Sequence, residues 1–533
     1  MGTTLLVAIN ARYSHTNLAV RSLRRALEAA GIPAEVAEYT INQPDRELLA
    51  DIARREPERV LLSCYLWNIE TVRRVGADLR LLFPELPILL GGPEVSFGPK
   101  ERLASMPWAD AILCGEGEAL TPRVLRGSAR PRGVFRAEGF VDLDALPFPY
   151  DDLDALQDRV LYYESSRGCP FGCAYCLSSA DRVVRYRSLP LVFEDLRRFL
   201  DAGAMQVKFV DRTFNADPAR ALAIWRFLVE QDNGRTSFQM EVGGDLLDSG
   251  ALELFRRARP GLFQLEIGVQ STCPEALEAA CRKTDLPRLF RNVRAVQAAG
   301  NVHQHLDLIA GLPMEGFSRF TQSYDEVFAL HPEQLQLGFL KLLRGSTLYD
   351  RRADYGLVHS ETPPYEILST PWLSFRELCR LKAVEAMTET YHNSDRFSHT
   401  LGCLMERCPS PFAAMLELGE SMPDRSVGKY EYYDLLYAFC VKKGCDPERV
   451  RRLLKFDLCL HERPRRLPAC LVGTEPSPEE RRRLAALALP KRLYAEAFPF
   501  DVTAPGCPPG RVLLAFDHDR RDLSGHASWT RME

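Results

Sequence analysis

Residues 164–176 read Glu164-Ser-Ser-Arg-Gly-Cys-Pro-Phe-Gly-Cys-Ala-Tyr-Cys176 and follow directly on a strand-like apolar run. Their three thiols have the spacing C-x3-C-x2-C in a short loop that is rich in glycine and proline. Thiolates are soft ligands that suit iron–sulfur clusters and zinc. Because three cysteines leave one metal position without a protein ligand, the loop predicts a metal centre that a substrate can reach.

Strand and helix patterns alternate through residues 161–370, starting at this loop. Six strands in this order predict an open, partial (βα)6 barrel whose chemistry lies in the loops at the carboxyl ends of the strands. The predicted strands are Leu161–Glu164, Gln206–Val210, Phe238–Val242, Leu262–Ile267, His305–Ile309 and Gln334–Phe339.

Residues 1–130 alternate in the same way and predict a Rossmann-like domain with a parallel, doubly wound sheet. Ligands of such sheets bind at the carboxyl ends of the strands. Residues 131–160 contain scattered prolines and predict a linker, whereas residues 371–533 predict a mainly helical region with loosely ordered last residues. The predicted strands of the first domain are Thr4–Ile9, Ala34–Tyr39, Arg59–Cys64, Leu86–Leu90 and Ala109–Cys114.

Length and composition fit a protein of two or three globular domains, with 533 residues and 46% hydrophobic content. The formal net charge of −4 gives no strong attraction to nucleic acid or to anionic membranes. No apolar run is long enough for a membrane span, and no secretory signal is visible, so the sequence predicts a cytoplasmic location. In a reducing compartment the 15 cysteines are not expected to form disulfides.

The cysteine loop resembles that of the radical S-adenosylmethionine (SAM) superfamily, which has the form C-x3-C-x-aromatic-C after the first barrel strand, with Tyr175 as the aromatic residue here. The resemblance covers about residues 160–345. It implies that Cys169, Cys173 and Cys176 hold a [4Fe–4S] cluster and that SAM chelates the fourth iron. Reductive cleavage of SAM would then give methionine and a 5′-deoxyadenosyl radical.

Residues at later strand ends are candidates for holding SAM, namely Asp211, Glu241 and Gln270, together with Tyr175. Carboxylates accept hydrogen bonds from an ammonium group and from ribose hydroxyls. The family's usual Gly-Gly-Glu after the second strand is replaced by Val210-Asp211-Arg212. Alternatively, these residues shape loops or bind the substrate.

Two metal-site alternatives remain for the cysteines. The loop could hold a structural zinc ion, although closed zinc sites usually take four ligands. Farther along the chain, Cys403 and Cys408 could form half of a second metal site, or they could be scattered core cysteines.

The first domain resembles the cobalamin-binding domain that precedes the barrel in many radical SAM enzymes. The resemblance rests on Gly91-Gly92-Pro93-Glu94 and Gly115-Glu116-Gly117-Glu118, which follow the fourth and fifth strands. It implies that Gly91, Gly92, Gly115, Glu116 and Gly117 contact cobalamin and that Ser63 lines the nucleotide pocket. Alternatively, the domain is a lid that no longer binds cobalamin.

The first loop of this domain departs from the cobalamin-domain pattern D-x-H-x-x-G. His15 occupies the histidine position, but the aspartate and the glycine are absent. By the resemblance, Tyr13 and His15 lie near the lower face of the corrin, with His15 as a possible cobalt ligand. Alternatively, His15 caps a helix or makes a hydrogen bond within the loop.

Together these features predict a cobalamin-dependent radical SAM enzyme that methylates an unactivated carbon. The nearest alternative is a radical cyclisation or rearrangement without methyl transfer, and another is a non-enzymatic iron–sulfur sensor or binding module. The expected partners are a small-molecule or peptide substrate and an electron donor such as flavodoxin or ferredoxin.

Overall fold

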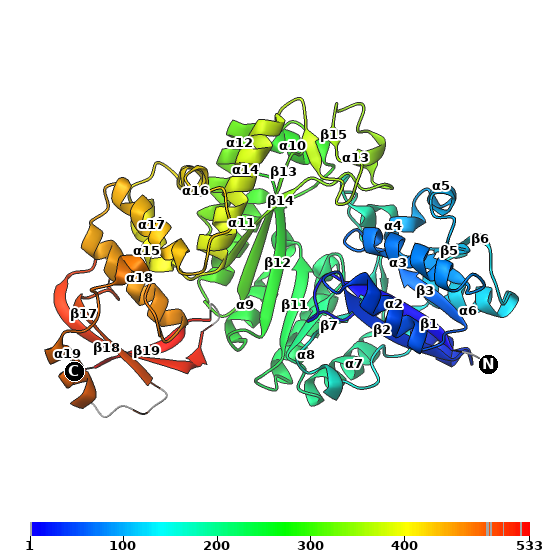
Figure 1. The fold of residues 1–533 in the computed structure, drawn as a ribbon, viewed down its shortest axis with the longest axis horizontal. Helices are drawn as coiled ribbons and strands as arrows, with labels where there is room; N and C mark the ends of the chain where they lie inside the picture. Colours follow the sequence, from blue (N-terminus) through cyan, green and yellow to red (C-terminus); the bar gives the residue numbers. More distant parts are fainter. Residues whose placement is uncertain (1–2, 487–489, 491–492, 505, 523–524, 533) are drawn as a thin grey trace. The chain divides into compact units, whose positions relative to one another are not determined.

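The computed structural model describes residues 3–486, 490, 493–504, 506–522 and 525–532 (Figure 1). The chain divides into two compact units. Unit 1 comprises residues 1–266, 277–292 and 339–371, and unit 2 comprises residues 267–276, 293–338 and 372–533. These limits differ from the expected domain boundaries, which remain predictions. Within the described residues, no helix has the length and apolarity that crossing a membrane requires.

The first sheet lies in unit 1 and has six parallel strands in the order β2-β1-β3-β4-β5-β6. The strand order reverses at β1, which pairs with β2 on one side and with β3 on the other. This reversal is typical of doubly wound sheets, so the Rossmann-like prediction is confirmed. The strands are β1 (Thr4–Asn10), β2 (Ala34–Thr40), β3 (Arg59–Ser63), β4 (Ile88–Gly91), β5 (Ala111–Cys114) and β6 (Gly133–Arg136).

Alternating side chains of β1 explain why helices cover both faces of this sheet. Leu5 and Val7 pack in one cluster with residues of α2 and α3, whereas Leu6 and Ala8 pack in another with residues of α1 and α6. Both faces are apolar, so each one requires a layer of helices. The helices are α1 (Leu18–Ala29), α2 (Asp45–Arg54), α3 (Ile69–Leu82), α4 (Pro93–Ser96), α5 (Pro99–Ala104) and α6 (Gly117–Gly127).

The segment predicted to be a linker contains the edge strand β6, so the prediction is wrong there. β6 pairs in parallel with β5, with Ala111 opposite Gly133. Its four residues are too few to show a strand period, and pairing with the neighbouring strand, not local pattern, makes them a strand. Two 3₁₀ turns follow it, at Leu143–Ala145 and Asp154–Leu156.

The second sheet contains all six predicted barrel strands in the order β14-β13-β12-β11-β10-β7. Pairing is parallel where β10 meets β7 and β11. An order that follows the sequence without reversal agrees with the predicted partial barrel. The strands are β7 (Val160–Tyr163), β10 (Gln206–Phe209), β11 (Ser237–Val242), β12 (Phe263–Gln270), β13 (His303–Ala310) and β14 (Gln334–Phe339).

Helices and short elements connect these strands. Each crossover between consecutive strands contains at least one helix, as parallel pairing requires. The helices are α7 (Leu189–Asp201), α8 (Pro218–Glu230), α9 (Ser249–Arg257), α10 (Pro274–Ala279), α11 (Leu286–Gln297), α12 (Phe317–Phe328) and α13 (Thr347–Asp350). The short strands are β8 (Ser166–Arg167), β9 (Arg185–Tyr186), β15 (Val358–His359) and β16 (Ile367–Ser369).

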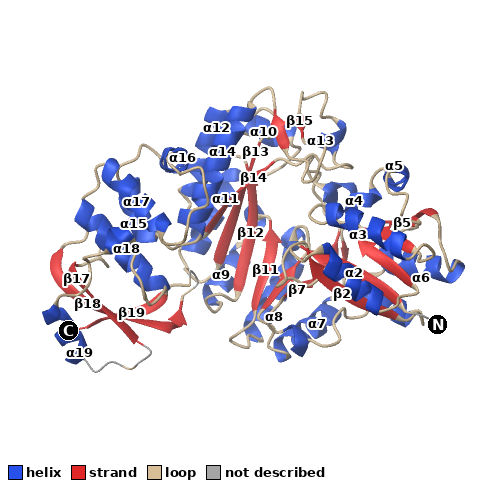
Figure 2. Cartoon of the chain, in the orientation of Figure 1, coloured by secondary structure: helices blue, strands red, loops and turns tan. Residues whose placement is uncertain are grey.

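The C-terminal region is mainly helical, as predicted, but it ends in an antiparallel sheet, β17-β18-β19, beside α18 (Figure 2). The expectation of loosely ordered last residues is therefore wrong for these strands. In β18, Val512 and the run from Leu514 to Asp517 are buried, so the strand lacks the simple alternation that predicts a half-buried strand. The elements are α14 (Phe375–Met387), η6 (Thr388–Asn393), α15 (Ser398–Met405), α16 (Pro411–Glu420), α17 (Glu431–Lys442), α18 (Pro447–His461), α19 (Pro478–Ala486), β17 (Leu493–Phe500), β18 (Pro509–Arg521) and β19 (Ala527–Met532).

Candidate active site

The cysteine loop begins directly after β8 and returns to the antiparallel partner strand β9. The Cys169 N–H donates to the Asp181 carbonyl at 3.0 Å, which holds the two ends of the loop together. Gly168 has φ +97°, and a Cβ there would lie 2.3 Å from the Val183 carbonyl oxygen. Because only glycine fits this conformation and this close approach, Gly168 sets the direction in which the loop leaves the strand.

The loop brings its three thiols into one locus inside unit 1. Cys169 and Cys173 are each 8% exposed, and Cys176 is half-buried. Burial raises the pKa of Cys169, and the Cys176 and Cys173 thiols raise it further. Thr213 Oγ1 lies 3.7 Å from Cys169 Sγ, and Arg282 donates to Cys173 Sγ at 3.8 Å. A hydroxyl and a guanidinium are thus placed to stabilise thiolate charge.

This donor set fits an iron–sulfur cluster. Among the residues that the structure describes, no group of three or more His, Cys, Asp or Glu side chains is arranged to hold a single metal ion. The ligands of a structural zinc ion converge on one ion, whereas each cysteine of a four-iron cluster binds a different iron. Two buried thiols and one half-buried thiol in one loop fit the predicted cluster, and Cys169 and Cys173 each have a polar neighbour.

Tyr175 lies half-buried within the loop, where its hydroxyl is close to Cys173 and Arg282. Burial raises the pKa of Tyr175, so its hydroxyl stays protonated. The neighbouring Ala174 anchors the loop, since its N–H donates to the Ala280 carbonyl at 2.8 Å. A contact between Tyr175 and SAM remains a prediction.

The carboxylate of Asp211 binds protein groups in the structure, and its contact with SAM remains a prediction. Its Oδ1 accepts the Ser165 N–H at 2.8 Å, and its Oδ2 accepts the hydroxyls of Ser165 at 2.7 Å and Ser166 at 2.5 Å. The residue is 2% exposed, and burial raises its pKa to about 6. With both oxygens engaged, Asp211 holds the backbone that leads into the cysteine loop.

Glu241 belongs to a row of polar side chains on neighbouring strands of unit 1. Burial raises the pKa of Glu241, and the Arg212 guanidinium partly offsets this effect. Lys208 Nζ lies 2.8 Å from a Glu266 carboxylate oxygen, which also accepts from Gln239. Sequence reasoning missed this row, although polar residues at every second position of the strands are a signal for it. The prediction that Glu241 holds SAM remains open.

Gln270 ends β12 in unit 2, with φ +72°, which is uncommon for a residue other than glycine. Its side-chain oxygen is buried and has no hydrogen-bond partner within the described residues. A buried, unpaired acceptor costs free energy unless a ligand or water supplies a donor. This observation fits the predicted contact with SAM, which remains a prediction.

The loops after β3 and β4 combine a close backbone approach with an unsatisfied hydroxyl. Gly92 has φ +111°, and a Cβ there would lie 2.5 Å from the Cys64 carbonyl oxygen. At Gly91 a Cβ would meet nothing closer than 3.7 Å. In the described chain, Ser63 Oγ is buried without a hydrogen-bond partner. That orphaned hydroxyl fits the predicted pocket for a polar nucleotide tail.

The glycines after β5 are needed by the protein's own packing. At Gly115, with φ +94°, a Cβ would lie 3.0 Å from Ala137 Cβ. At Gly117 it would lie 2.8 Å from a Leu23 methyl group. These contacts account for both glycines without cobalamin, so their roles in binding it remain predictions.

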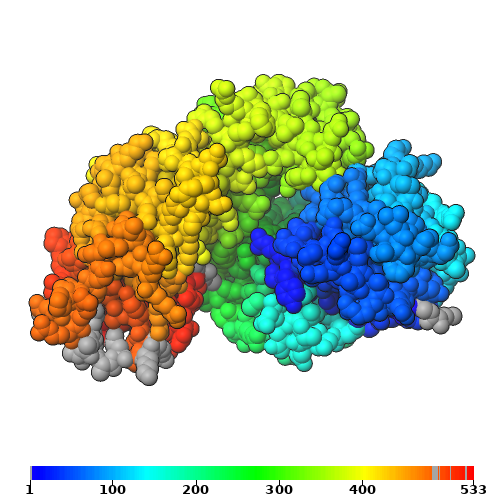
Figure 3. Space-filling view, viewed as in Figure 1, coloured from blue at the N-terminus to red at the C-terminus, as the bar shows by residue number. Residues whose placement is uncertain are grey.

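Glu116 and Glu118, the two carboxylates that follow β5, bind arginines that flank the cysteine loop. Glu116 accepts from Arg185 at 2.6 Å and from the Val141 N–H at 2.7 Å. Glu118 pairs with Arg167 at 2.9 Å. In Figure 3, the blue surface of the first domain directly adjoins the cyan surface of the following segment. Glu116 is therefore engaged by protein groups, and its contact with cobalamin remains a prediction.

The first loop is attached to strand β7. His15 Nδ1 lies 2.6 Å from the Tyr162 hydroxyl, and the Val160 N–H donates to the Ser14 carbonyl at 2.7 Å. Burial lowers the pKa of His15, so the ring is neutral. Tyr13 is 76% exposed, and the Arg159 guanidinium lies 4.4 Å from its ring centre. The structure thus contains the alternative hydrogen bond for His15, and contacts of His15 and Tyr13 with cobalamin remain predictions.

The C-terminal cysteines lie mostly in the core. Cys403, Cys440 and Cys445 are buried and Cys408 is half-buried. The Cys445 thiol lies 3.7 Å from the Cys403 carbonyl oxygen. The neighbouring thiols of Cys445, Cys403 and Cys408 add to the effect of burial in raising the pKa of Cys440, so these cysteines lie together in the core. A metal site at Cys403 and Cys408 remains a prediction.

Three family models match successive parts of the chain. Residues 4–125 match the B12 binding domain, and residues 163–327 match the radical SAM superfamily. Residues 353–502 match a family described as a protein of unknown function, DUF4080. The first match includes the loops after β3, β4 and β5, and the second includes the cysteine loop.

Similar proteins include methyltransferases. The cobalamin-dependent radical SAM methyltransferase TokK of Streptomyces tokunonensis is 25% identical over 57% of this chain and 50% of its own length. The hopanoid C-3 methylase of Methylococcus capsulatus is 25% identical over 53% of this chain and 58% of its own length. The chain thus spans about half the length of these relatives. A solved structure of the cobalamin-dependent SAM radical enzyme OxsB superposes on this chain with a TM-score of 0.58 and 15% sequence identity. The match covers 91% of this chain and 75% of OxsB, and it shows a shared fold.

Proposed function

We propose that this chain, which matches the B12 binding domain at residues 4–125 and the radical SAM superfamily at residues 163–327, is a cobalamin-dependent enzyme that methylates an unactivated carbon. Curated relatives that are methyltransferases support the choice of reaction. The activity is a proposal because those relatives share only about half of their length with this chain.

We assign Cys169, Cys173 and Cys176 as ligands of a [4Fe–4S] cluster. When bound, the cluster and cobalamin supply the one-electron cleavage of SAM and the carriage of a methyl group. Arg282 and Thr213 stabilise the thiolate charge, since both lie within 3.8 Å of a cysteine sulfur. In this proposal Arg282 and Thr213 help to hold Cys173 and Cys169 in the loop that follows the first barrel strand.

The remaining polar groups orient SAM in this proposal. Glu241 and the row around Lys208 and Glu266 supply acceptors and a cation for the amino and ribose groups. Asp211 acts indirectly, because it holds Ser165 and Ser166 beneath the loop.

Ion pairs between the Gly-Glu-Gly-Glu loop after β5 and the cysteine loop carry the proposal. Glu116 and Glu118 follow β5 of the first sheet, and they pair with Arg185 and Arg167, which flank the cysteine loop. All four residues lie in unit 1. The carboxyl-end loop of one sheet thus contacts the carboxyl-end loop of the other. Such contact supports a reaction that needs both cofactors near one substrate.

The substrate we propose is a small molecule or a peptide, and the electron donor is a protein such as flavodoxin or ferredoxin. We also propose a cytoplasmic location. All 15 cysteines are free in the structure, which suits a reducing compartment.

Anaerobic purification of the full chain from cells supplied with cobalamin tests the proposal. We expect iron, sulfide and corrin in the purified protein. With SAM and a reductant, we expect S-adenosylhomocysteine from methyl transfer and 5′-deoxyadenosine from radical cleavage. The Cys169→Ser variant should lose 5′-deoxyadenosine, whereas the Cys379→Ser control, at an exposed cysteine of α14, should retain it.

The two products separate the alternatives. Protein that forms 5′-deoxyadenosine but binds no corrin and makes no S-adenosylhomocysteine would support a cyclisation or rearrangement instead. A stable cluster with no cleavage of SAM would favour a sensor or binding module. Either result would remove the methyl-transfer proposal.

A further inference from the structure

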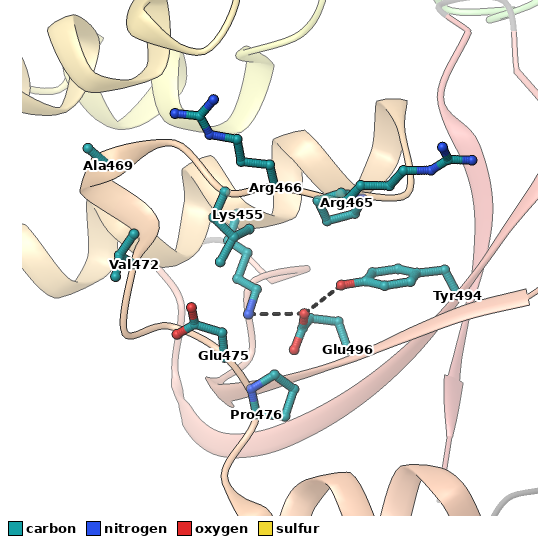
Figure 4. Close-up of a pocket in the computed structure, with 11 residues that line it drawn as sticks. Lys455, Arg465, Arg466, Ala469, Val472, Glu475, Pro476, Tyr494 and Glu496 are labelled. Carbon is teal, nitrogen blue, oxygen red and sulfur yellow. Dashed lines mark hydrogen bonds and ion pairs between the residues drawn. The ribbon is translucent and has the colours of Figure 1, made fainter.

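A cavity of about 570 Å³ lies in the C-terminal region, wholly within unit 2 (Figure 4). Side chains of α18, of the segment that follows it and of β17 line the cavity. Small-molecule sites typically have volumes of about 300–1,000 Å³. The cavity is therefore large enough for a metabolite, and no described function of this region accounts for it.

A buried ion pair forms the floor of this cavity. Lys455 and Glu496 are 1% and 2% exposed, and their charged groups lie 3.0 Å apart. Glu496 also accepts from the Tyr494 hydroxyl at 2.9 Å and from the Ala497 N–H at 3.0 Å. These bonds engage both of its oxygens and hold the carboxylate in place.

Lys455 retains hydrogen-bonding capacity. An ammonium group has three donors. Within the described residues, Lys455 donates to Glu496 and to the Thr474 carbonyl, the latter at 2.5 Å. Its ammonium lies amid the lining side chains in Figure 4. The described residues thus account for two of its three donors.

The rim adds positive charge that the protein does not neutralise. Arg465 and Arg466 line the cavity on the segment after α18, and both are exposed. Neither has an ion-pair partner in the part of the chain that the structure describes, whereas Arg449 in the same unit pairs with Glu406 at 3.0 Å. Figure 4 shows the two side chains extending to opposite sides of the cavity.

The acidic side chains of the lining do not balance this charge. Glu496 is committed to Lys455, and the Glu475 carboxylate accepts the Gly473 N–H at 2.7 Å. Three cations against two carboxylates leave an excess of one positive charge among the charged lining residues. Guanidinium groups bind carboxylate and phosphate oxygens in a bidentate manner.

We propose that this cavity binds a small molecule through an oxyanion, a phosphate or a carboxylate, attracted by Lys455 at the floor and by Arg465 and Arg466 on opposite sides of the rim. The site is independent of the cysteine loop and of the proposed methyl transfer. Binding can therefore be measured without turnover.

Calorimetric titration of the full chain with inorganic phosphate and, separately, with citrate tests the site. We expect millimolar or tighter binding of at least one probe. The Arg465→Gln/Arg466→Gln variant should bind that probe about tenfold more weakly for each arginine removed, because charge-assisted hydrogen bonds are lost. The matched control is Arg376→Gln/Arg407→Gln, which changes two exposed arginines of unit 2 outside the cavity.

A second variant, Lys455→Gln/Glu496→Gln, removes the floor charges together, with circular dichroism to verify folding. Weaker binding in both cavity variants and unchanged binding in the control would support the site. The preferred probe would then identify phosphate or carboxylate as the ligand group. The proposal would be overturned if neither probe bound, or if the cavity and control variants lost binding equally.

Discussion

The two parallel sheets of the chain bury their strands in different ways. Every residue of β1 in the first sheet is buried. In β12 and β13 of the second sheet, buried residues alternate with half-buried ones. A strand covered on both faces can offer a ligand only the loop at its end, whereas a barrel strand also presents side chains on its inner face.

This difference predicts where changes act in each sheet. In the first sheet, function depends on backbone shape at loops such as Gly92 and on hydroxyls such as Ser63. In the second, it depends on side chains such as Cys169, Glu241 and Lys208. Five experiments test this contrast between the two sheets.

The largest effect is expected at the cysteine loop. Changing Cys169, Cys173 or Cys176 to Ala should reduce cluster absorbance and SAM cleavage to background, because the protein supplies only these three thiolates. Iron analysis and 5′-deoxyadenosine assays measure the result. Corrin content should persist, since the corrin loops belong to the other sheet. A cysteine variant with normal iron content would contradict the cluster assignment.

Asp211 should make stability depend on pH. Its pKa is about 6 in the folded protein against a usual 3.8, so the native state holds the proton more tightly. The contribution of Asp211 to the free energy of unfolding is then greatest below pH 4. It falls as the pH rises through 6, by about 3 kcal/mol at most. Urea unfolding at several pH values should show this slope in the parent and less of it in Asp211→Asn. The exposed control Asp201→Asn should keep it, and equal slopes in all three would refute the assignment.

Adjacent glycines of the first sheet provide a matched pair. Gly92→Ala should destabilise the protein by about 2 kcal/mol and lower corrin uptake, because its φ of +111° and the Cys64 carbonyl both oppose a Cβ. Gly91→Ala should change stability by less than about 1 kcal/mol, since its nearest neighbour is 3.7 Å away. Thermal unfolding and corrin absorbance test both. Similar losses in the two variants would disprove the backbone argument.

A double-mutant cycle can measure the link between the two sheets. Glu116→Gln and Arg185→Gln, singly and combined, should give a coupling free energy of about 1–2 kcal/mol, because the pair is largely buried and 2.6 Å apart. The exposed pair Arg198 and Glu194 serves as the control and should couple by less than about 0.5 kcal/mol. A Glu116–Arg185 coupling no larger than the control would weaken the proposed link.

The smallest effect is expected at His15. Because the aspartate and the glycine of the pattern D-x-H-x-x-G are absent, His15→Gln should leave the corrin absorption spectrum unchanged. Loss of the contact between its Nδ1 and Tyr162 should cost about 1 kcal/mol of stability. A spectral shift in this variant, absent from Tyr162→Phe, would instead identify His15 as a cobalt ligand.

Most of the fold could be predicted because its signals are local. All six barrel strands and the helix Ile69–Leu82 follow apolar periods of the sequence. The edge strand β6 could not be predicted, since its four residues are strand only by pairing with β5. The C-terminal sheet was missed because the buried residues of β18 do not alternate with exposed ones and lie between charged residues.

The sequence by itself determined the chemistry of the cysteine loop. Three thiols within eight residues are neighbours in any fold, so their spacing alone indicates a soft metal centre. Only the tertiary structure decided the partners of the surrounding charges. Asp211 lies 46 residues from Ser165, and Glu116 lies 69 residues from Arg185. A carboxylate shows its ionic chemistry in the sequence, but whether it meets a ligand or a protein donor depends on contacts made only when distant segments pack together.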